Sequence, residues 1–438
     1  MEIFKIFLSR VLLSRILLHF FRWLFFNNWR TSFSFIYPNE QWHDRYSVFL
    51  ATYFYWLFKP LAIFLVNKKI LFSVNNIHNA VGHVYPEVDY LLRLKKTDEK
   101  VKDKSIFYIY PKNPVLTGFV KAVGHSTEVK FILSGFLHLI IWPLLMRYPE
   151  LTISAAHGPY NYSIDRSKKF LKVIYPNHLS YADIFRQRQN KYSQLRAQTL
   201  DYYPLKTVSS LPNELAEMIG LSKYIVIQIK TEAANGTIQP VDPSTYVDAL
   251  NVMISLGYKV VFAGREKMPD IFAKIGVINY AESKNATAIN DYLLVLNSSG
   301  VLASSSGFCY IPDVLDIPLL TINVLYLTAY PGRNTINIPS LLSKDNTPMK
   351  FKEQLEYIYS RGQVTNKTIM EDNVLCDDAS SEDILLAFKE LYIIIEKGYI
   401  PLISDLQLEF KNHFPLELTS SHPARISHSF IKKHRDRY

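Results

Sequence analysis

Residues 300–307 are Gly-Val-Leu-Ala-Ser-Ser-Ser-Gly, and this stretch contains the pattern that decides the fold. The first four residues predict a short strand that is buried on both faces. The serines and Gly307 predict a loop at its carboxyl end, and residues 308–315 predict a short helix. Strand, polar loop and helix in this order form the repeating unit of a parallel sheet covered by helices.

The same unit recurs through the second half of the chain. The apolar, β-branched runs predict further strands at 224–229, 259–263 and, as the last one, 319–323. Helices are predicted between them at 244–256, begun by Ser244 and ended by Gly257, and at 289–296. Ligands of such sheets bind outside the carboxyl ends of the strands. The polar residues predicted to face one crevice there are Lys230, Arg265, Ser305, Ser306 and Gly307.

The first half shows the pattern less regularly. Residues 69–74 predict a strand, 75–83 a loop containing Gly82, and 85–94 a helix. Further elements are predicted as strands at 106–110 and 172–175, a strongly apolar helix at 131–146, and a polar, helical connection between the halves at 180–220.

Length, charge and cysteine content limit the classes of protein. A chain of 438 residues suggests two domains. The net charge of +10 favours an anionic partner, but no nucleic-acid-binding motif occurs, so acidic lipid and phosphorylated substrate rank above nucleic acid. The two cysteines, Cys309 and Cys376, are far apart, which argues against a disulfide framework and a cysteine-based zinc site.

The first 75 residues predict contact with a membrane. Residues 3–26 are almost wholly apolar or basic, and Arg15, His19 and Arg22 share one face of a helix, as in helices that lie in the headgroup region. A second apolar stretch at 48–66 is long enough to span a bilayer but contains Lys59-Pro60. A span, an interfacial hairpin and buried helices all remain open here.

Several short motifs occur in a fixed order over roughly residues 69–390. In the first half they are Val81-Gly82-His83 and the following Pro86-Glu87-x-Asp89. In the second half they are 242–249, 260–264, 305–307, then Pro312, Pro318 and Asn323, and finally 372–373 and 382–384. No single motif is specific, but in this order they resemble those of a family of glycosyltransferases from bacterial surface-polysaccharide loci. The family's His-x-Arg strand end is replaced by Gln228 and Lys230, which removes a bidentate phosphate contact.

The resemblance implies an α/β protein of the GT-B type, with two Rossmann-like, doubly wound lobes and a nucleotide-sugar donor in the cleft. It implies no metal and no cofactor. The expected function is transfer of a sugar to a glycan or lipid-linked glycan at the cytoplasmic face of the bacterial inner membrane. The expected parts are a membrane-associated helical segment, an acceptor lobe, a donor lobe and a C-terminal helical tail, at residues 1–68, 69–210, 211–390 and 391–438.

The chemistry of sugar transfer assigns roles to the candidate residues. The leaving diphosphate needs cations and backbone N–H groups, which Lys230, Arg265 and the helix start at Ser305, Ser306 and Gly307 can supply; each is equally compatible with a surface charge or an ordinary helix cap. His83 is the candidate catalytic base, with Gly82, Glu87 and Asp89 as further acceptor or cleft residues. Asn323 either contacts the nucleotide base or simply ends a strand.

Other chemistries lack their signatures. The sequence contains no GxGxxG, Walker A, HExxH, GxSxG or Asp-x-Asp motif. One alternative is a catalytically inactive, membrane-bound partner in glycan assembly, which the Gln228 and Lys230 replacements keep open. Another is a membrane-associated acyltransferase using His178 and Asp183, which have the His-x4-Asp spacing.

Overall fold

The computed structural model describes twelve stretches of the chain. They are residues 55–74, 81–110, 114–123, 128–133, 181–207, 209–220, 222–231, 241–327, 329–361, 366–398, 404–414 and 423–437, with a few isolated positions between 140 and 153 and at 364. The predicted N-terminal helix at 3–26, the predicted strand at 172–175 and His178 lie outside them.

The N-terminal lobe contains a parallel sheet of order β1-β2-β3. Its elements are α4 (Tyr55–Asn67), β1 (Ile70–Val74), α5 (Val81–Thr97), β2 (Ser105–Tyr110), α6 (Pro114–Val123) and β3 (Val129–Leu133). Helices α10 (Tyr181–Gln198) and α11 (Asn213–Ile219) follow, in the segment that leads to the second lobe.

The second lobe is built on a seven-stranded sheet of order β13-β9-β8-β7-β4-β5-β6, in which every neighbouring pair is parallel. Its strands are β4 (Tyr224–Gln228), β5 (Lys259–Phe262), β6 (Ile278–Asn279), β7 (Gly300–Ser304), β8 (Leu319–Val324), β9 (Thr335–Pro339) and β13 (Arg425–Ile426). Its helices are η2 (Pro243–Tyr246), α12 (Val247–Ser255), α13 (Asp270–Lys274), α14 (Ala288–Leu296), η3 (Gly307–Cys309), α15 (Tyr310–Leu315), α18 (Ser381–Lys397), α19 (Asp405–His413), α20 (His428–Lys433) and η4 (Arg435–Arg437).

A small antiparallel sheet of order β11-β10-β12 stands beside the large one. It comprises β10 (Leu341–Lys344), β11 (Thr347–Pro348) and β12 (Val374–Asp377), with α16 (Phe351–Arg361) and α17 (Asn366–Glu371) between β11 and β12.

The central strands are apolar up to their carboxyl ends because the large sheet is covered on both faces. All of β4 and β7 is buried. Along β4, Tyr224 and Val226 enter the core on one face of the sheet, whereas Ile225 and Ile227 enter the core on the other. Alternation of this kind follows from the two-residue period of a strand, and burial on both faces explains why no polar residue interrupts it.

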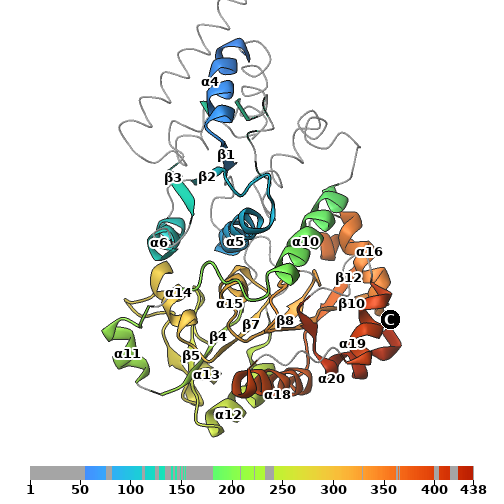
Figure 1. Cartoon of the computed structure of the whole chain (residues 1–438). Coiled ribbons are helices and arrows are strands. Elements are labelled where there is room, and N and C mark those ends of the chain that lie inside the picture. The colour runs from blue at the N-terminus through green and yellow to red at the C-terminus, as the bar shows by residue number, and fades with distance from the viewer. Residues whose placement is uncertain are drawn as a thin grey trace, which may run out of the picture.

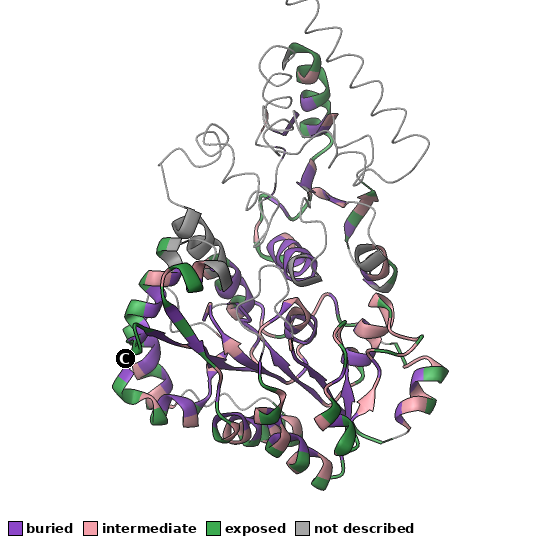
Figure 2. Ribbon diagram, turned by 180° about the vertical axis from the view of Figure 1, so that it is seen from behind, coloured by how far each residue is buried: buried purple, intermediate pink, exposed green. Residues whose placement is uncertain are grey.

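The two lobes share one apolar core. Helices α5 and α6 lie between the two sheets, where α5 packs on α15 and α6 packs on α14 (Figures 1 and 2). The ring of Tyr85 lies 4.5 Å from that of Phe119 and 6.4 Å from that of Tyr292, measured between centroids. A Cβ on Gly118 would come within 2.7 Å of the Ala288 Cβ, so only glycine lets α6 approach α14 this closely.

Three predictions for the first half need correction or qualification. Residues 131–133 belong to strand β3, not to a helix, because they pair with β2 and complete the sheet. Helix α5 begins at Val81, so Gly82 and His83 lie in its first turn and not in the preceding loop. Within the apolar stretch 48–66, the described helix α4 has 13 residues, and no helix in the described parts of the chain is long and apolar enough to cross a membrane.

The second half contains the predicted strands and helices in their predicted order, but α13 and β6 were not predicted and β8 is not the last strand. Strands β9 and β13 extend the sheet beyond it, and β13 comes from the segment predicted as a C-terminal tail. The helix after β4 is entered through η2, whose N-cap is Asp242: its carboxylate accepts a hydrogen bond from the Ser244 N–H at 2.8 Å.

Candidate functional site

The strand order of the large sheet reverses between β4 and β7. From β4 the chain runs outward through β5 and β6, and it then returns to form β7, β8 and β9 on the other side of β4. Ligands of doubly wound sheets bind where the strand order reverses in this way, outside the carboxyl ends of the two strands. In this lobe those ends are Gln228 of β4 and Ser304 of β7.

Two hydrogen bonds join the loops at this point. The Ser306 hydroxyl donates to Oε1 of the buried Gln228 at 2.6 Å. The backbone N–H of Lys230 donates to the Ser304 hydroxyl at 3.0 Å. The neighbouring strand end also approaches closely: Gly264 has a φ of 110°, and a Cβ there would lie 3.0 Å from the Gln228 Cγ. Three strand ends therefore meet around the Gln228 side chain.

Lys230 brings a cation to this edge of the sheet. Its side chain is half-buried, and burial lowers its pKa, an effect that Cys309 and Glu266 oppose. No carboxylate among the described residues lies within salt-bridge distance of its ammonium. A partly desolvated cation of this kind interacts more strongly with an anion than a surface lysine does.

The serine loop is held by Tyr330. The Tyr330 hydroxyl donates to the Ser306 carbonyl at 2.9 Å and lies 3.2 Å from the Ser305 hydroxyl. The backbone N–H of Ser305 donates to Ile322 of β8 at 2.8 Å. Gly307 then begins the turn η3. Because Tyr330 is buried, this support comes from inside the lobe and fixes the loop that leaves β7.

The structure places Asn323 and Arg265 apart from this arrangement. Asn323 has a left-handed φ of 59°, its Nδ2 donates to Asp378 at 2.8 Å, and its Oδ1 accepts from the Ala379 N–H at 3.0 Å. The nitrogen and the oxygen of its side-chain amide thus both bind the segment that leads into α18. Arg265 is exposed, and its positive charge acts to lower the pKa of Asp291 in α14. Burial of Asp291 outweighs this effect and raises its pKa to about 6.

The residues predicted in the first lobe separate into three groups. Gly82 and His83 lie in the first turn of α5, which packs against η3 immediately after Ser306; the structure describes their backbone but not their side chains. Glu87 is buried under its own sheet, accepting from the hydroxyls of Ser73 at 3.0 Å and Tyr108 at 2.7 Å. Asp89 faces the second lobe.

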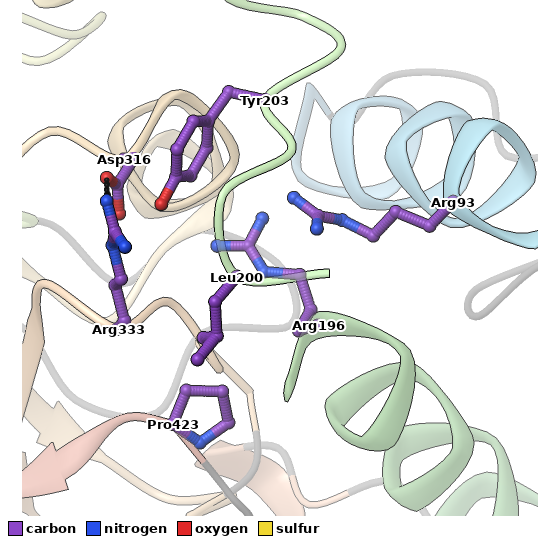
Figure 3. Close-up of a pocket in the computed structure, with 7 residues that line it drawn as sticks. All are labelled: Arg93, Arg196, Leu200, Tyr203, Asp316, Arg333 and Pro423. Carbon is purple, nitrogen blue, oxygen red and sulfur yellow. Dashed lines mark hydrogen bonds and ion pairs between the residues drawn. The ribbon is translucent and has the colours of Figure 1, made fainter. Parts of the chain in front are cut away.

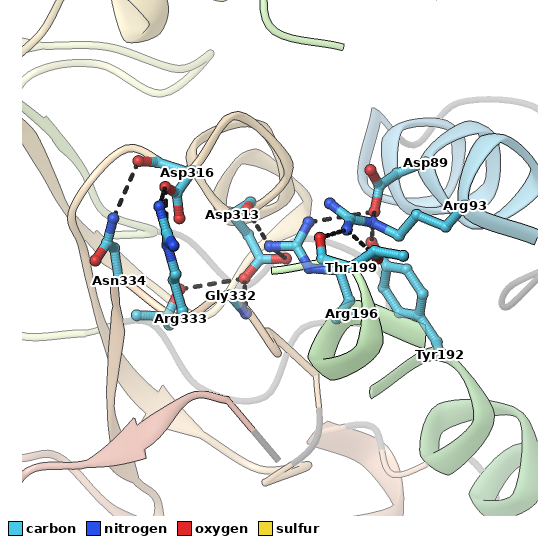
Figure 4. Close-up of polar contacts among 11 residues, drawn as sticks. Asp89, Arg93, Tyr192, Arg196, Thr199, Asp313, Asp316, Gly332, Arg333 and Asn334 are labelled. Carbon is cyan, nitrogen blue, oxygen red and sulfur yellow. Dashed lines mark hydrogen bonds and ion pairs between the residues drawn. The ribbon is translucent and has the colours of Figure 1, made fainter. Parts of the chain in front are cut away.

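Asp89 belongs to a buried ionic cluster between the lobes, which sequence reasoning missed (Figure 4). Its Oδ2 accepts from Arg93 at 2.8 Å, from the Tyr192 hydroxyl at 2.7 Å and from Arg196 at 3.2 Å. Burial acts to raise the pKa of Asp89, but the charges of Arg93 and Arg196 outweigh it and the pKa lies below its ordinary value.

Arg196 extends this cluster to the second lobe. Its Nη2 donates to the Asp313 carbonyl in α15 at 2.7 Å and lies 3.9 Å from the Asp313 carboxylate. That carboxylate also accepts from the Gly332 N–H at 2.6 Å and from the Thr335 hydroxyl at 3.2 Å. Burial raises the pKa of Asp313 to about 6, an effect that Arg196 opposes.

A shallow, cation-lined pocket opens next to this cluster (Figure 3). It is lined by Arg93, Arg196, Leu200, Tyr203, Asp316, Arg333 and Pro423. Arg333 is paired with Asp316 at 3.1 Å and with Asp201 at 2.9 Å, so the aspartates offset much of the positive charge. The cations of this pocket thus have carboxylate partners within the protein. At the strand ends around Gln228, by contrast, Lys230 has no ion-pair partner among the described residues.

Comparisons with known proteins give only remote similarities. No protein-family model matches the sequence, and no curated protein matches it. Among solved structures, the chain is similar to a glycosyltransferase family 9 protein from Veillonella parvula, with 12% identity and a TM-score of 0.45, over 74% of this chain and 98% of that one. It is also similar to the E. coli heptosyltransferase WaaC with ADP (10%, TM-score 0.39, 69% and 98%) and to the E. coli ADP-heptose LPS heptosyltransferase II (12%, 0.38, 69% and 97%).

Replacing Arg196 by alanine should destabilise the protein strongly, because Asp89 and Asp313 would lose the cation that faces both. Removing one partner of a buried ion pair costs about 3–5 kcal/mol. Arg435→Ala is the matched control, since Arg435 pairs with Glu409 at an exposed site, where such a pair contributes less than about 1 kcal/mol. Urea unfolding of both variants measures the difference, and equal losses would contradict the role given to Arg196.

The raised pKa of Asp313 predicts a dependence of stability on pH. An unfolded aspartate ionises near pH 4, whereas Asp313 in the folded protein ionises at about 6. Between these values the folded state binds more protons than the unfolded state, so the contribution of Asp313 to stability falls as pH rises, by up to about 3 kcal/mol. Asp313→Asn should therefore lose less stability than the wild type between pH 4.5 and 7 in urea unfolding. The same change in both proteins would show that Asp313 does not titrate in this window.

Proposed function

We propose that this protein is a glycosyltransferase that binds a nucleotide-sugar donor at the carboxyl ends of β4 and β7 and transfers the sugar to a surface-glycan acceptor. The proposal rests chiefly on one observation. The strand order reverses between β4 and β7, and at this edge Lys230 is bonded to Ser304, the end of β7, and Ser306 to Gln228, the end of β4. The ordered motifs of the sequence, which resemble those of bacterial polysaccharide glycosyltransferases, support the same reading.

The residues at this edge suit the chemistry of the leaving group. As the glycosidic bond to the diphosphate breaks, negative charge grows on the phosphate oxygens and must be stabilised. Lys230 offers a half-buried ammonium, and a bound phosphate would raise the pKa that burial lowers. The Ser306 hydroxyl has one proton, which it now donates to Gln228, so a phosphate contact from this group requires that bond to open. The proposal includes no metal and no further cofactor.

The acceptor side of the proposed reaction lies on α5. This helix packs against η3, the turn that directly follows Ser306, and its first turn contains Gly82 and His83. An imidazole ionises near neutral pH and can accept a proton from an acceptor hydroxyl. We assign His83 as the base on this support. Glu87 and Asp89 have structural partners instead.

The proposed acceptor is a glycan or lipid-linked glycan at the cytoplasmic face of the bacterial inner membrane. Support comes from the basic and aromatic composition of the first 75 residues, which is typical of segments that lie in a lipid headgroup region.

The double variant Lys230→Ala, Ser306→Ala should lose donor affinity by at least tenfold while remaining folded. Thermal shift against UDP, GDP, CMP, dTDP and ADP measures this, because a ligand that binds only the native state raises the melting temperature. We expect one nucleotide to stabilise the wild type by a few degrees and the double variant not at all. The matched control is Lys223→Ala, which removes an exposed lysine directly before β4 and five residues before Gln228.

Two outcomes would contradict the proposal at different points. Undiminished affinity in the double variant would remove the donor site from the β4–β7 edge. A well-folded wild type that binds none of the nucleotides would favour a catalytically inactive assembly partner over a transferase.

A further inference from the structure

Helix α4 is fixed to the first lobe by one narrow face. Ala62 and Leu65 are buried in a small apolar cluster with Phe72 of β1 and Ile109 of β2. This cluster is separate from the two large cores of the molecule. The remaining side of α4 therefore contributes nothing to the described hydrophobic core of the lobe.

The rest of the surface of α4 is exposed, and Figure 2 colours most of the helix accordingly. Around this surface lie six of the twelve large apolar side chains that are exposed in the described part of the chain, with exposed fractions of 37–59%: Trp56, Leu57, Leu61, Ile63, Phe64 and Val66. Scattered exposed apolar residues are ordinary, but a contiguous patch of this kind marks an interaction surface.

The charges within and directly beside α4 in the sequence are positive. No Asp or Glu occurs between residues 45 and 86, whereas Lys59 lies within α4 and Lys68 follows its end. The next residue, Lys69, is paired with Asp103 and does not add to this charge. The Lys68 ammonium is 6.0 Å from the centroid of the Phe64 ring, so a cation borders the apolar patch directly. An apolar face bordered by lysines is complementary to a lipid surface with anionic headgroups.

The residues inside α4 bear on how such a surface is met. Lys59 and Pro60 lie within the helix, where a charge at the bilayer centre would be costly. The helix can therefore lie along the surface with its apolar face in the acyl boundary and its lysines among the headgroups.

We propose that α4 docks the protein on an anionic lipid surface, with the exposed side chains of Trp56, Ile63 and Phe64 inserted below the headgroups. Figure 1 places α4 at the end of the first lobe that is farthest from the large sheet. Docking through α4 leaves the β4–β7 edge accessible to a water-soluble donor and presents the first lobe to acceptors in the membrane. This inference concerns lipid contact alone, and its test involves no nucleotide.

A label on α4 tests the proposal in the full-length protein. The native cysteines Cys309 and Cys376 are both buried, so a thiol-reactive, polarity-sensitive fluorophore will react selectively with a Phe64→Cys variant. Met370→Cys is the matched control, because Met370 in α17 is 80% exposed and lies outside α4. Each labelled protein is mixed with vesicles of phosphatidylcholine, with and without phosphatidylglycerol, carrying bromine on the acyl chains.

We expect the label on Phe64→Cys to shift to the blue and to be quenched by the brominated lipid when phosphatidylglycerol is present, and the label on Met370→Cys to change in neither respect. An unlabelled Ile63→Ser, Phe64→Ser variant should bind these vesicles at least tenfold more weakly than the wild type, since burial of each side chain is worth a factor of roughly ten. Met370→Ser should bind as the wild type does, and thermal melting checks that both variants are folded.

Three results would overturn the proposal. Flotation of the protein with the vesicles while the label on Phe64→Cys stays unquenched would place the lipid contact on another segment. Shielding of the label in the monomer, before lipid is added, would mean that the chain covers α4 itself. Shielding that depends on protein concentration would assign the face to a second copy.

Discussion

The relative position of the two lobes depends on one buried guanidinium. Arg196 donates to Asp89 of α5 and to the Asp313 carbonyl of α15, so it contacts both lobes at once. A buried charge is tolerated only where its partners are in place, which leaves α5 and α15 few positions relative to each other. The close approach of α6 to α14 at Gly118 adds a second, apolar constraint on the same interface.

This constraint also shapes the candidate donor site. Because α5 is held on α15, its first turn stays near η3, the turn that follows Ser306. On the side of the large sheet, Gln228 is surrounded by the ends of β4, β5 and β7, and Tyr330 supports the serine loop from within the lobe. Lys230 is thus a half-buried cation at this junction, on which the charge of Glu266 acts. The diphosphate of the donor is the anion that we propose as its partner.

The parts of the fold that sequence predicts are those set by local patterns. Strands β4, β5 and β7 contain short apolar runs because they are buried on both faces, and β8 was recognised despite Thr321 and Asn323. Strand β9 was not predicted, and its central residue Asn337 is buried and accepts a hydrogen bond from Thr321 of β8. Strand β13 has only two residues and pairs with a strand almost ninety positions earlier, so its sequence has no period to recognise.

The candidate site divides in the same way. The rule that polar loops gather at the carboxyl ends of parallel strands placed Lys230 and Ser306 at one edge, where hydrogen bonds from these two residues join the ends of β4 and β7. It did not reveal that Asn323 forms hydrogen bonds with Asp378 and Ala379. It also did not reveal that Arg196 donates to Asp313, 117 positions away, because these partners come from distant segments. A polar helix such as α10 gives no local sign of which of its arginines will be buried.

The most direct test of the account is hydrogen exchange of the full-length protein with and without the nucleotide that stabilises it. Bound donor at the β4–β7 edge predicts slower exchange in peptides covering residues 224–231, 260–268 and 304–312, with little change in β10, β12 and α18. Protection confined to other segments, such as α16 or the cation-lined pocket between the lobes, would contradict the assignment of the donor site to the reversal of strand order.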